Sequence, residues 1–134
     1  FYYNDSGPAC TMWCYEYDHD SGAISHRHTF FPNDSYPDAI PDGMTIDTEG
    51  NIWCAIWEGS CVICLNPEGD IIQRIAFDTP RTTSCAFGGD DLSTLYVTSC
   101  SQDITTEKQP LAFPAGALFE VSGHGKGFAA DFFG

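Results

Sequence analysis

Apolar residues fall in short runs along this chain, and polar, glycine- or proline-containing segments separate the runs every few residues. The 13 glycines and 8 prolines supply the breaks, and no stretch shows the apolar period of a long helix. Short runs rich in β-branched and aromatic residues between turn signals are typical of β-strands. The pattern predicts an all-β protein with strands at residues 12–17, 24–30, 52–57, 61–65, 71–77, 95–100 and 117–121.

An internal repeat gives these strands an order. Residues 52–57 (IWCAIW) and 95–100 (LYVTSC) have the same form, and residues 1–6 (FYYNDS) match both. A second strand follows each of them, and a further short strand, at 41–47 or 83–89, precedes two of them. Trp53 and Tyr96 lie 43 residues apart, which is the length of a four-stranded propeller blade, roughly 40–45 residues in the best-known case.

The repeat predicts about three consecutive blades of a β-propeller. We expect a partial blade over residues 1–39 that lacks its innermost strand, a full blade over 40–80, and a blade over 81–134 with a long polar insertion at 102–115 and a weak last strand at 128–132. Propellers need roughly four to eight blades to close. The chain also opens without Met or a leader sequence. We therefore expect it to be a segment of a longer protein.

Charge and cysteine content narrow the possible partners and compartment. Lys and Arg number 5 against 19 Asp and Glu, a net charge of −14, so we expect neither nucleic-acid nor anionic-membrane binding. No apolar run approaches the roughly 18 residues of a membrane span. Seven cysteines at irregular spacing predict free thiols in a reducing cytoplasm. Cys61 and Cys64 have zinc-knuckle spacing, but residues three apart on a strand point to opposite faces, which disfavours zinc.

Asp42 is the main candidate for chemistry. It stands in a Pro-Asp-Gly motif at the start of the full blade's innermost strand, where side chains can face a central channel. A hard divalent cation takes carboxylate oxygens, and metal-assisted ester hydrolysis needs a base near the attacking water. The alternative is an ordinary turn, because Asp and Gly are turn formers. Ser84 and Trp57 are candidate substrate-lining residues: Ser84 occupies the place of Asp42 in the next blade, and Trp57 ends its strand at a blade loop, where ordinary packing is the alternative.

Four other titratable side chains favour structural interpretations. Asp47 leads into a predicted hairpin turn and is expected to carry surface charge, and Asp5 is expected to anchor a turn through backbone amides. His26 and His28 lie on one face of a strand and could hold a transition metal. Their strand is predicted to be the outermost one of its blade, so we expect an exposed face.

The motifs at residues 40–53 (IPDGMTIDTEGNIW), 55–59 (AIWEG), 83–89 (TSCAFGG) and 95–99 (LYVTS) resemble the family of regucalcin (senescence marker protein), gluconolactonases and insect luciferin-regenerating enzymes. The resemblance covers essentially the whole chain and about the carboxy-terminal half of a family member. It implies a six-bladed β-propeller with one divalent metal in the channel, calcium most commonly, with zinc, manganese or magnesium as substitutes. Of the family's three metal ligands, only the Asp of the Pro-Asp-Gly motif has a counterpart here, Asp42.

The same resemblance implies a function. Its members hydrolyse sugar lactones and related esters, so the first interpretation is part of a metal-dependent lactonase-like hydrolase in which Asp42 is both metal ligand and catalytic base. Its partners would be a small lactone substrate and the missing amino-terminal half of the propeller. The second interpretation is a calcium-binding regulatory protein without physiological catalysis on the same scaffold. The third is an inactive fragment.

Overall fold

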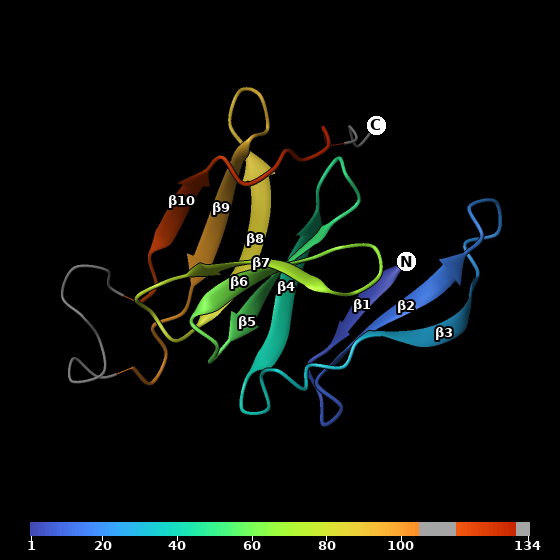
Figure 1. The fold of residues 1–134 in the computed structure, drawn as a ribbon, viewed down its shortest axis with the longest axis horizontal. Coiled ribbons are helices and arrows are strands. Elements are labelled where there is room, and N and C mark those ends of the chain that lie inside the picture. The colour runs from blue at the N-terminus through green and yellow to red at the C-terminus, as the bar shows by residue number, and fades with distance from the viewer. Residues whose placement is uncertain (105–114, 131–134) are drawn as a thin grey trace.

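The computed structural model describes residues 1–104 and 115–130, and these residues form strands and connections without a helix (Figure 1). The strands are β1 (Tyr2–Asp5), β2 (Thr11–Tyr17), β3 (Ile24–Phe31), β4 (Ile40–Ile46), β5 (Ile52–Trp57), β6 (Cys61–Leu65), β7 (Ile71–Ala76), β8 (Thr82–Gly88), β9 (Thr94–Ser99) and β10 (Leu118–Ser122). Within these two ranges no helix is long and apolar enough to cross a membrane.

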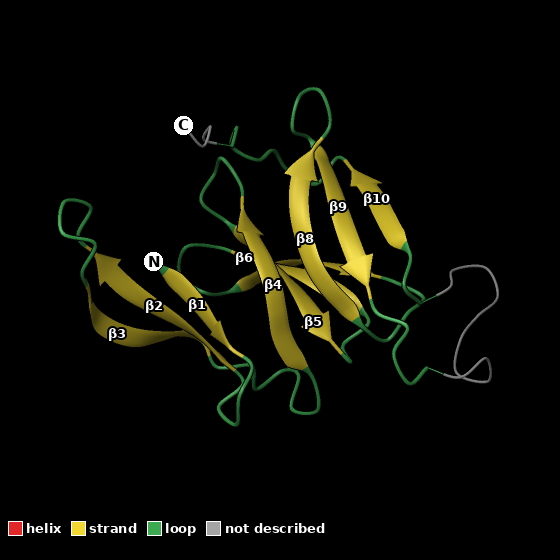
Figure 2. Cartoon of the chain, turned by 180° about the vertical axis from the view of Figure 1, so that it is seen from behind, coloured by secondary structure: helices red, strands yellow, loops and turns green. Residues whose placement is uncertain are grey.

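The ten strands make three antiparallel sheets, ordered β1-β2-β3, β4-β5-β6-β7 and β8-β9-β10. Each sheet is a meander in which consecutive strands pair, and Figure 2 shows the three sheets side by side, with β4 and β8 next to each other. Successive meanders that stack on one another are the blades of a propeller. The all-β prediction is confirmed, and the structure is part of a propeller.

Two apolar layers hold the sheets together. One lies between the first and second sheets and contains Met12, Cys54 and Ile63, and the other lies between the second and third sheets and contains Trp53 and Val97. The middle sheet is thus covered on both faces, which explains why β5 and β6 are almost continuously apolar and buried. Burying each large apolar side chain contributes about 1.5–3 kcal/mol.

The structure corrects the last predicted strand. Residues 128–130 are not in a strand, while residues 131–134, like 105–114 of the predicted insertion, lie outside the described residues. Gly127 instead forms a single antiparallel bridge with Asp47, and the amide of Thr48 donates to the carbonyl of Lys126 at 2.8 Å. Gly125, with a φ of 146°, sits where this segment turns across the β4–β5 hairpin. The chain after β10 therefore covers a neighbouring blade and does not extend its own sheet there.

Candidate functional site

Asp42 lies on β4 at an irregularity in the strand pairing. Pro41 pairs with Ile56 and Met44 pairs with Cys54, so β4 carries one residue more than β5 between these pairs. A β-bulge of this kind re-aims a side chain, and bulges are common beside functional sites. Asp42 is half-buried; burial raises the pKa of its carboxyl, and a hydrogen bond from the backbone amide of Gly43 offsets part of the rise. Because the motif lies within a continuous strand, the turn interpretation is wrong.

One side chain from β1 and one from the residue directly after it hold the backbone at Asp42. The amide nitrogen Nδ2 of Asn4 donates to the carbonyl of Asp42, and the hydroxyl of Ser6 donates to the carbonyl of Pro41 at 3.2 Å. Asn4 Nδ2 also lies 3.3 Å from the sulfur of Cys54. The other amide atom, Asn4 Oδ1, is buried and without a hydrogen-bond partner. Sequence reasoning assigned no role to Asn4, and its only signal was a polar residue within an aromatic strand.

Gly43 sets how closely β4 approaches β8. A Cβ atom at this position would lie 2.3 Å from Ser84 Oγ and 2.7 Å from Ser84 Cα, well inside contact distance. Any other residue would push the two strands apart. Ser84 is exposed and packs on the Gly43 backbone. The Asp42–Gly43 dipeptide is therefore wedged between the first and third sheets, which gives the glycine of the motif a packing role.

Asp42 and Trp57 line one open cavity of about 250 Å³ together with Ile40 and Ser6. Trp57 comes to this place because it pairs with Ile40 across β4 and β5. Ser84 is not among the residues that line this cavity. Two of the three candidate residues thus share a cavity, and the third supports the strand that carries Asp42.

The donor chemistry at this cavity suits a cation, but the described residues supply only one carboxylate. Within residues 1–104 and 115–130, no group of three His, Cys, Asp or Glu side chains is arranged to bind a metal. No salt bridge is found for Asp42 in these ranges either. A half-buried carboxylate without a cationic partner is stabilised by a bound cation, and calcium takes six to eight oxygen ligands. Most oxygen ligands of a calcium ion bound at Asp42 would therefore have to come from outside the described residues.

Asp47 is buried, with 2% of its surface exposed, so the expected surface charge is wrong. Its Oδ1 accepts hydrogen bonds from the amides of Glu49 and Asn51, and its Oδ2 accepts from Asn51 Nδ2 and Trp53 Nε1, all at 2.9 Å. Burial acts to raise the pKa of this carboxyl, but these hydrogen bonds outweigh it, and the pKa is lowered. The predicted turn is present. Asp5 also anchors a turn, because the amide of Gly7 donates to its Oδ1 at 3.0 Å.

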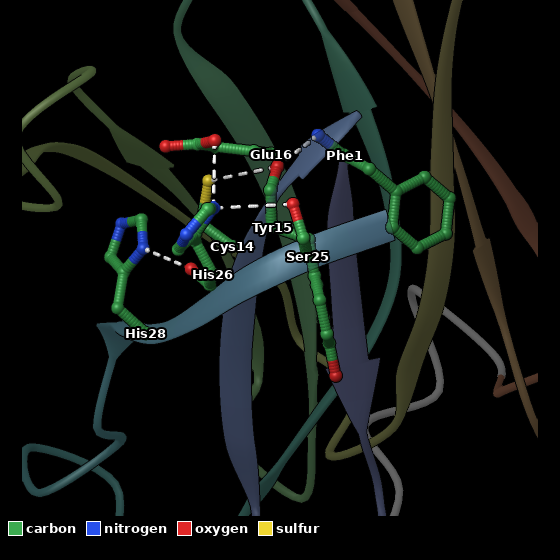
Figure 3. Close-up of polar contacts among 7 residues, drawn as sticks. All are labelled: Phe1, Cys14, Tyr15, Glu16, Ser25, His26 and His28. Carbon is green, nitrogen blue, oxygen red and sulfur yellow. Dashed lines mark hydrogen bonds and ion pairs between the residues drawn. The ribbon is translucent and has the colours of Figure 1, made fainter. Parts of the chain in front are cut away.

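The two histidines of β3 lie on an exposed surface of the first sheet (Figure 3). Nδ1 of His26 is 2.9 Å from Glu16 Oε2, and Nδ1 of His28 is 3.3 Å from the carbonyl of His26. His26 has a φ of 50° at a register shift between β2 and β3. The interpretation of these histidines as an exposed face is confirmed.

Stacked antiparallel meanders with a carboxylate on an inner strand define a segment of a propeller protein. Residues 1–101 match the family described as SMP-30/Gluconolactonase/LRE-like region, and the chain belongs to this family. Pentonolactonase XacC of Haloferax volcanii is 43% identical over 125 residues, which cover 90% of this chain and 42% of that protein.

Two solved structures of the same family superpose well. A luciferin-regenerating enzyme aligns with a TM-score of 0.83 and 33% identity over 96% of this chain and 43% of its own. A regucalcin of Agrobacterium tumefaciens, described as a calcium-binding protein, aligns with a TM-score of 0.83 and 27% identity over 95% of this chain and 43% of its own. The chain thus spans less than half the length of the relatives that it matches.

Proposed function

We propose that this chain is the carboxy-terminal part of a divalent-metal-dependent, lactonase-like hydrolase that opens sugar lactones or related esters. The observation that carries the proposal is Asp42, a half-buried carboxylate beside a cavity with no salt-bridge partner among the described residues. Family membership supports it, and so does the similarity to a pentonolactonase. The remaining propeller blades are the proposed partner, and the cytoplasm is the proposed compartment.

In this proposal Asp42 has two roles. One carboxylate oxygen would hold the cation, calcium in the first instance, and the carboxylate would accept the proton of the attacking water. The cation, when bound, supplies Lewis-acid polarisation of the lactone carbonyl. Trp57 would form one wall of the cavity and limit the entry of water, while Ser84 supports β4 at Gly43. Because only the ionised carboxylate can bind the cation or accept a proton, calcium affinity and activity should both fall as the pH drops into the range where Asp42 becomes protonated.

A calcium-binding regulatory protein without physiological catalysis is the second candidate. It is favoured by the similarity to a regucalcin described as a calcium-binding protein. Both candidates need the cation, so metal binding does not separate them. Initial rates of the full-length protein on a panel of sugar lactones do, because the second candidate predicts calcium binding without turnover.

Substitutions at Asp42 test the proposal in the full-length protein. Asp42→Asn keeps an oxygen but removes the charge, and Asp42→Ala removes both, so both variants should bind calcium more weakly, Ala more than Asn. Loss of the base should also lower lactonase activity on the order of 10²-fold or more. Calorimetric calcium titration beside initial rates measures both effects.

The matched control is Asp20→Asn, which removes one negative charge from an exposed turn between β2 and β3. It should leave calcium affinity and rate nearly unchanged. Unaltered affinity and rate in Asp42→Ala would instead assign Asp42 to the scaffold.

A further inference from the structure

Arg81 stands directly beside Trp57, at the entrance to β8. Its guanidinium carbon lies 4.9 Å from the centroid of the Trp57 ring, and its Nε donates to Glu58 Oε1 at 2.5 Å. A third contact runs from its NH1 group to the carbonyl of Gln102. The Arg81 side chain is mostly buried, with 18% of its surface exposed. Its guanidinium is therefore fixed by three partners from two segments, the end of β5 and the chain after β9.

The backbone around Arg81 is fixed as well. Trp57 and Arg81 form an antiparallel bridge, and the amide of Cys100 donates to the carbonyl of Arg81 at 3.0 Å. The amide of Ser60 donates to the carbonyl of Pro80 at 3.1 Å. The end of β5, the entrance to β8 and the exit of β9 are thus tied together at this point.

We propose that Arg81 is a positioning residue that holds the Trp57 ring as a wall of the Asp42 cavity and thereby sets which lactones fit. This inference rests on the proposed function. A guanidinium over an indole face favours one ring position, and the ion pair with Glu58 keeps the guanidinium in place. With the wall fixed, a ligand next to Asp42 meets a cavity of defined width. With the wall released, the ring can move and the cavity admits a wider range of shapes.

The test is Arg81→Met in the full-length protein, which keeps an unbranched apolar stem but removes the stacking and the ion pair. We expect kcat/KM for the best lactone to fall about 3- to 10-fold, the size of one cation–π contact, mainly through KM. The preference between lactones that differ in side-chain length should fall by a similar factor. Arg81→Lys should recover only part of the loss, because an ammonium cannot stack and pair as the planar guanidinium does.

The chain offers a matched control. Arg27 also lies over an indole, with its guanidinium carbon 4.6 Å from the centroid of the Trp13 ring, but on the outer strand of the first sheet. Arg27→Met removes the same kind of contact away from the cavity of Asp42. It should change neither KM nor the preference among lactones.

A second measurement does not depend on turnover. Protein labelled with 5-fluorotryptophan gives one fluorine NMR resonance per tryptophan, and Trp57→Phe identifies the resonance of Trp57. Arg81→Met should shift or broaden this resonance, and Arg27→Met should leave it unchanged.

The outcomes separate the two proposals. If no lactone is turned over by the wild type, the proposed function is rejected, and the Trp57 resonance alone decides whether Arg81 positions the ring. If lactones are turned over and Asp42→Ala abolishes turnover, an unchanged preference in Arg81→Met overturns the inference. Whether or not lactones are turned over, a Trp57 resonance that is unchanged in Arg81→Met overturns the inference that Arg81 positions the ring.

Discussion

Two aspartates five residues apart show how strongly the environment sets the chemistry of a single residue. Asp42 is desolvated beside a cavity and has a raised pKa, while Asp47 accepts four hydrogen bonds and has a lowered pKa. The first has unused capacity to bind a cation or accept a proton. The carboxylate oxygens of Asp47 already accept hydrogen bonds from the turn residues and from Trp53. The opposite shifts agree with a structural role for Asp47 in its turn and with the role in cation binding and catalysis that we propose for Asp42.

Asp47 should make stability depend on pH. A carboxylate whose pKa is lower in the folded state stabilises the fold above its unfolded pKa, about 3.9, and this stabilisation is lost as the pH falls through the folded value. Asp47→Asn removes the charge and replaces one carboxylate oxygen by an NH2 group, which cannot accept a hydrogen bond. Some of the groups that donate to Asp47 then lose their acceptor, and the free energy of unfolding should fall by about 1–3 kcal/mol at pH 7. Urea unfolding of wild type and variant between pH 7 and pH 3 measures the difference.

The difference between wild type and Asp47→Asn should be largest above about pH 5 and shrink toward pH 3, because the unfolded wild-type carboxyl takes up a proton there before the folded one, whose pKa is lowered. Asp20→Asn, in an exposed turn, is expected to stay within about 0.5 kcal/mol of wild type. A gap for Asp47→Asn that stays constant across this pH range would show that its charge is not what stabilises the turn.

At the scale of elements, the two central strands of the middle sheet are covered on both faces. Alternate residues of β5 and β6 point into different layers, so Cys61 packs in the first layer and Cys64 in the second. This confirms that the two sulfurs of the zinc-knuckle spacing diverge. Burial raises the pKa of Cys54 and that of Cys64 to about 12, and it also raises the pKa of Cys85.

These buried thiols should be unreactive in the folded protein. The thiolate is the nucleophile, and a thiol with a pKa near 12 is almost fully protonated at pH 8. Alkylation followed by peptide mapping should label the half-buried Cys10, Cys14 and Cys100 in native protein, and Cys54, Cys61, Cys64 and Cys85 only after unfolding. Native labelling of Cys85 as fast as that of Cys10, or a Cys61–Cys64 disulfide, would contradict this. A urea-unfolded sample is the control for complete labelling.

The elements that could be predicted from sequence are those whose pattern is local. The apolar runs at 52–57 and 61–65 correspond to β5 and β6 with the same bounds. A strand that is buried on both faces is apolar throughout, so the first and last apolar residues mark its ends. The burial of Asp47 could not be predicted, because the covering segment around Gly125 and Gly127 comes from the other end of the chain. The contact of Asn4 with Asp42 and that of Arg81 with Trp57 also join different sheets or strands. Such pairs leave no periodic signal.

At the scale of the whole molecule, the first and third sheets have three strands each among the described residues, one fewer than the middle sheet, and β1 and β10 are the edge strands where a fourth strand would pair. β1 pairs only with β2 and β10 pairs only with β9, within residues 1–104 and 115–130. Apolar side chains lie on or next to these edges, and Leu118 and Phe1 are 64% and 55% exposed. Open strand edges and exposed apolar residues invite association with another chain or another part of the same fold. The net charge of −14 opposes self-association through repulsion.

Residues 1–134 produced on their own should therefore associate, and salt should decide how far. At low ionic strength the repulsion of like charges acts over about 30 Å, whereas at 1 M salt it is screened to about 3 Å. The apolar edges are not weakened by this screening, so size-exclusion chromatography should show larger species as sodium chloride is raised. The full-length protein is the control, because its remaining blades should cover both edges and make its elution independent of salt. A chain of 134 residues that elutes as a monomer at all salt concentrations and melts cooperatively by circular dichroism would show that three sheets are sufficient, and that neither edge needs a partner.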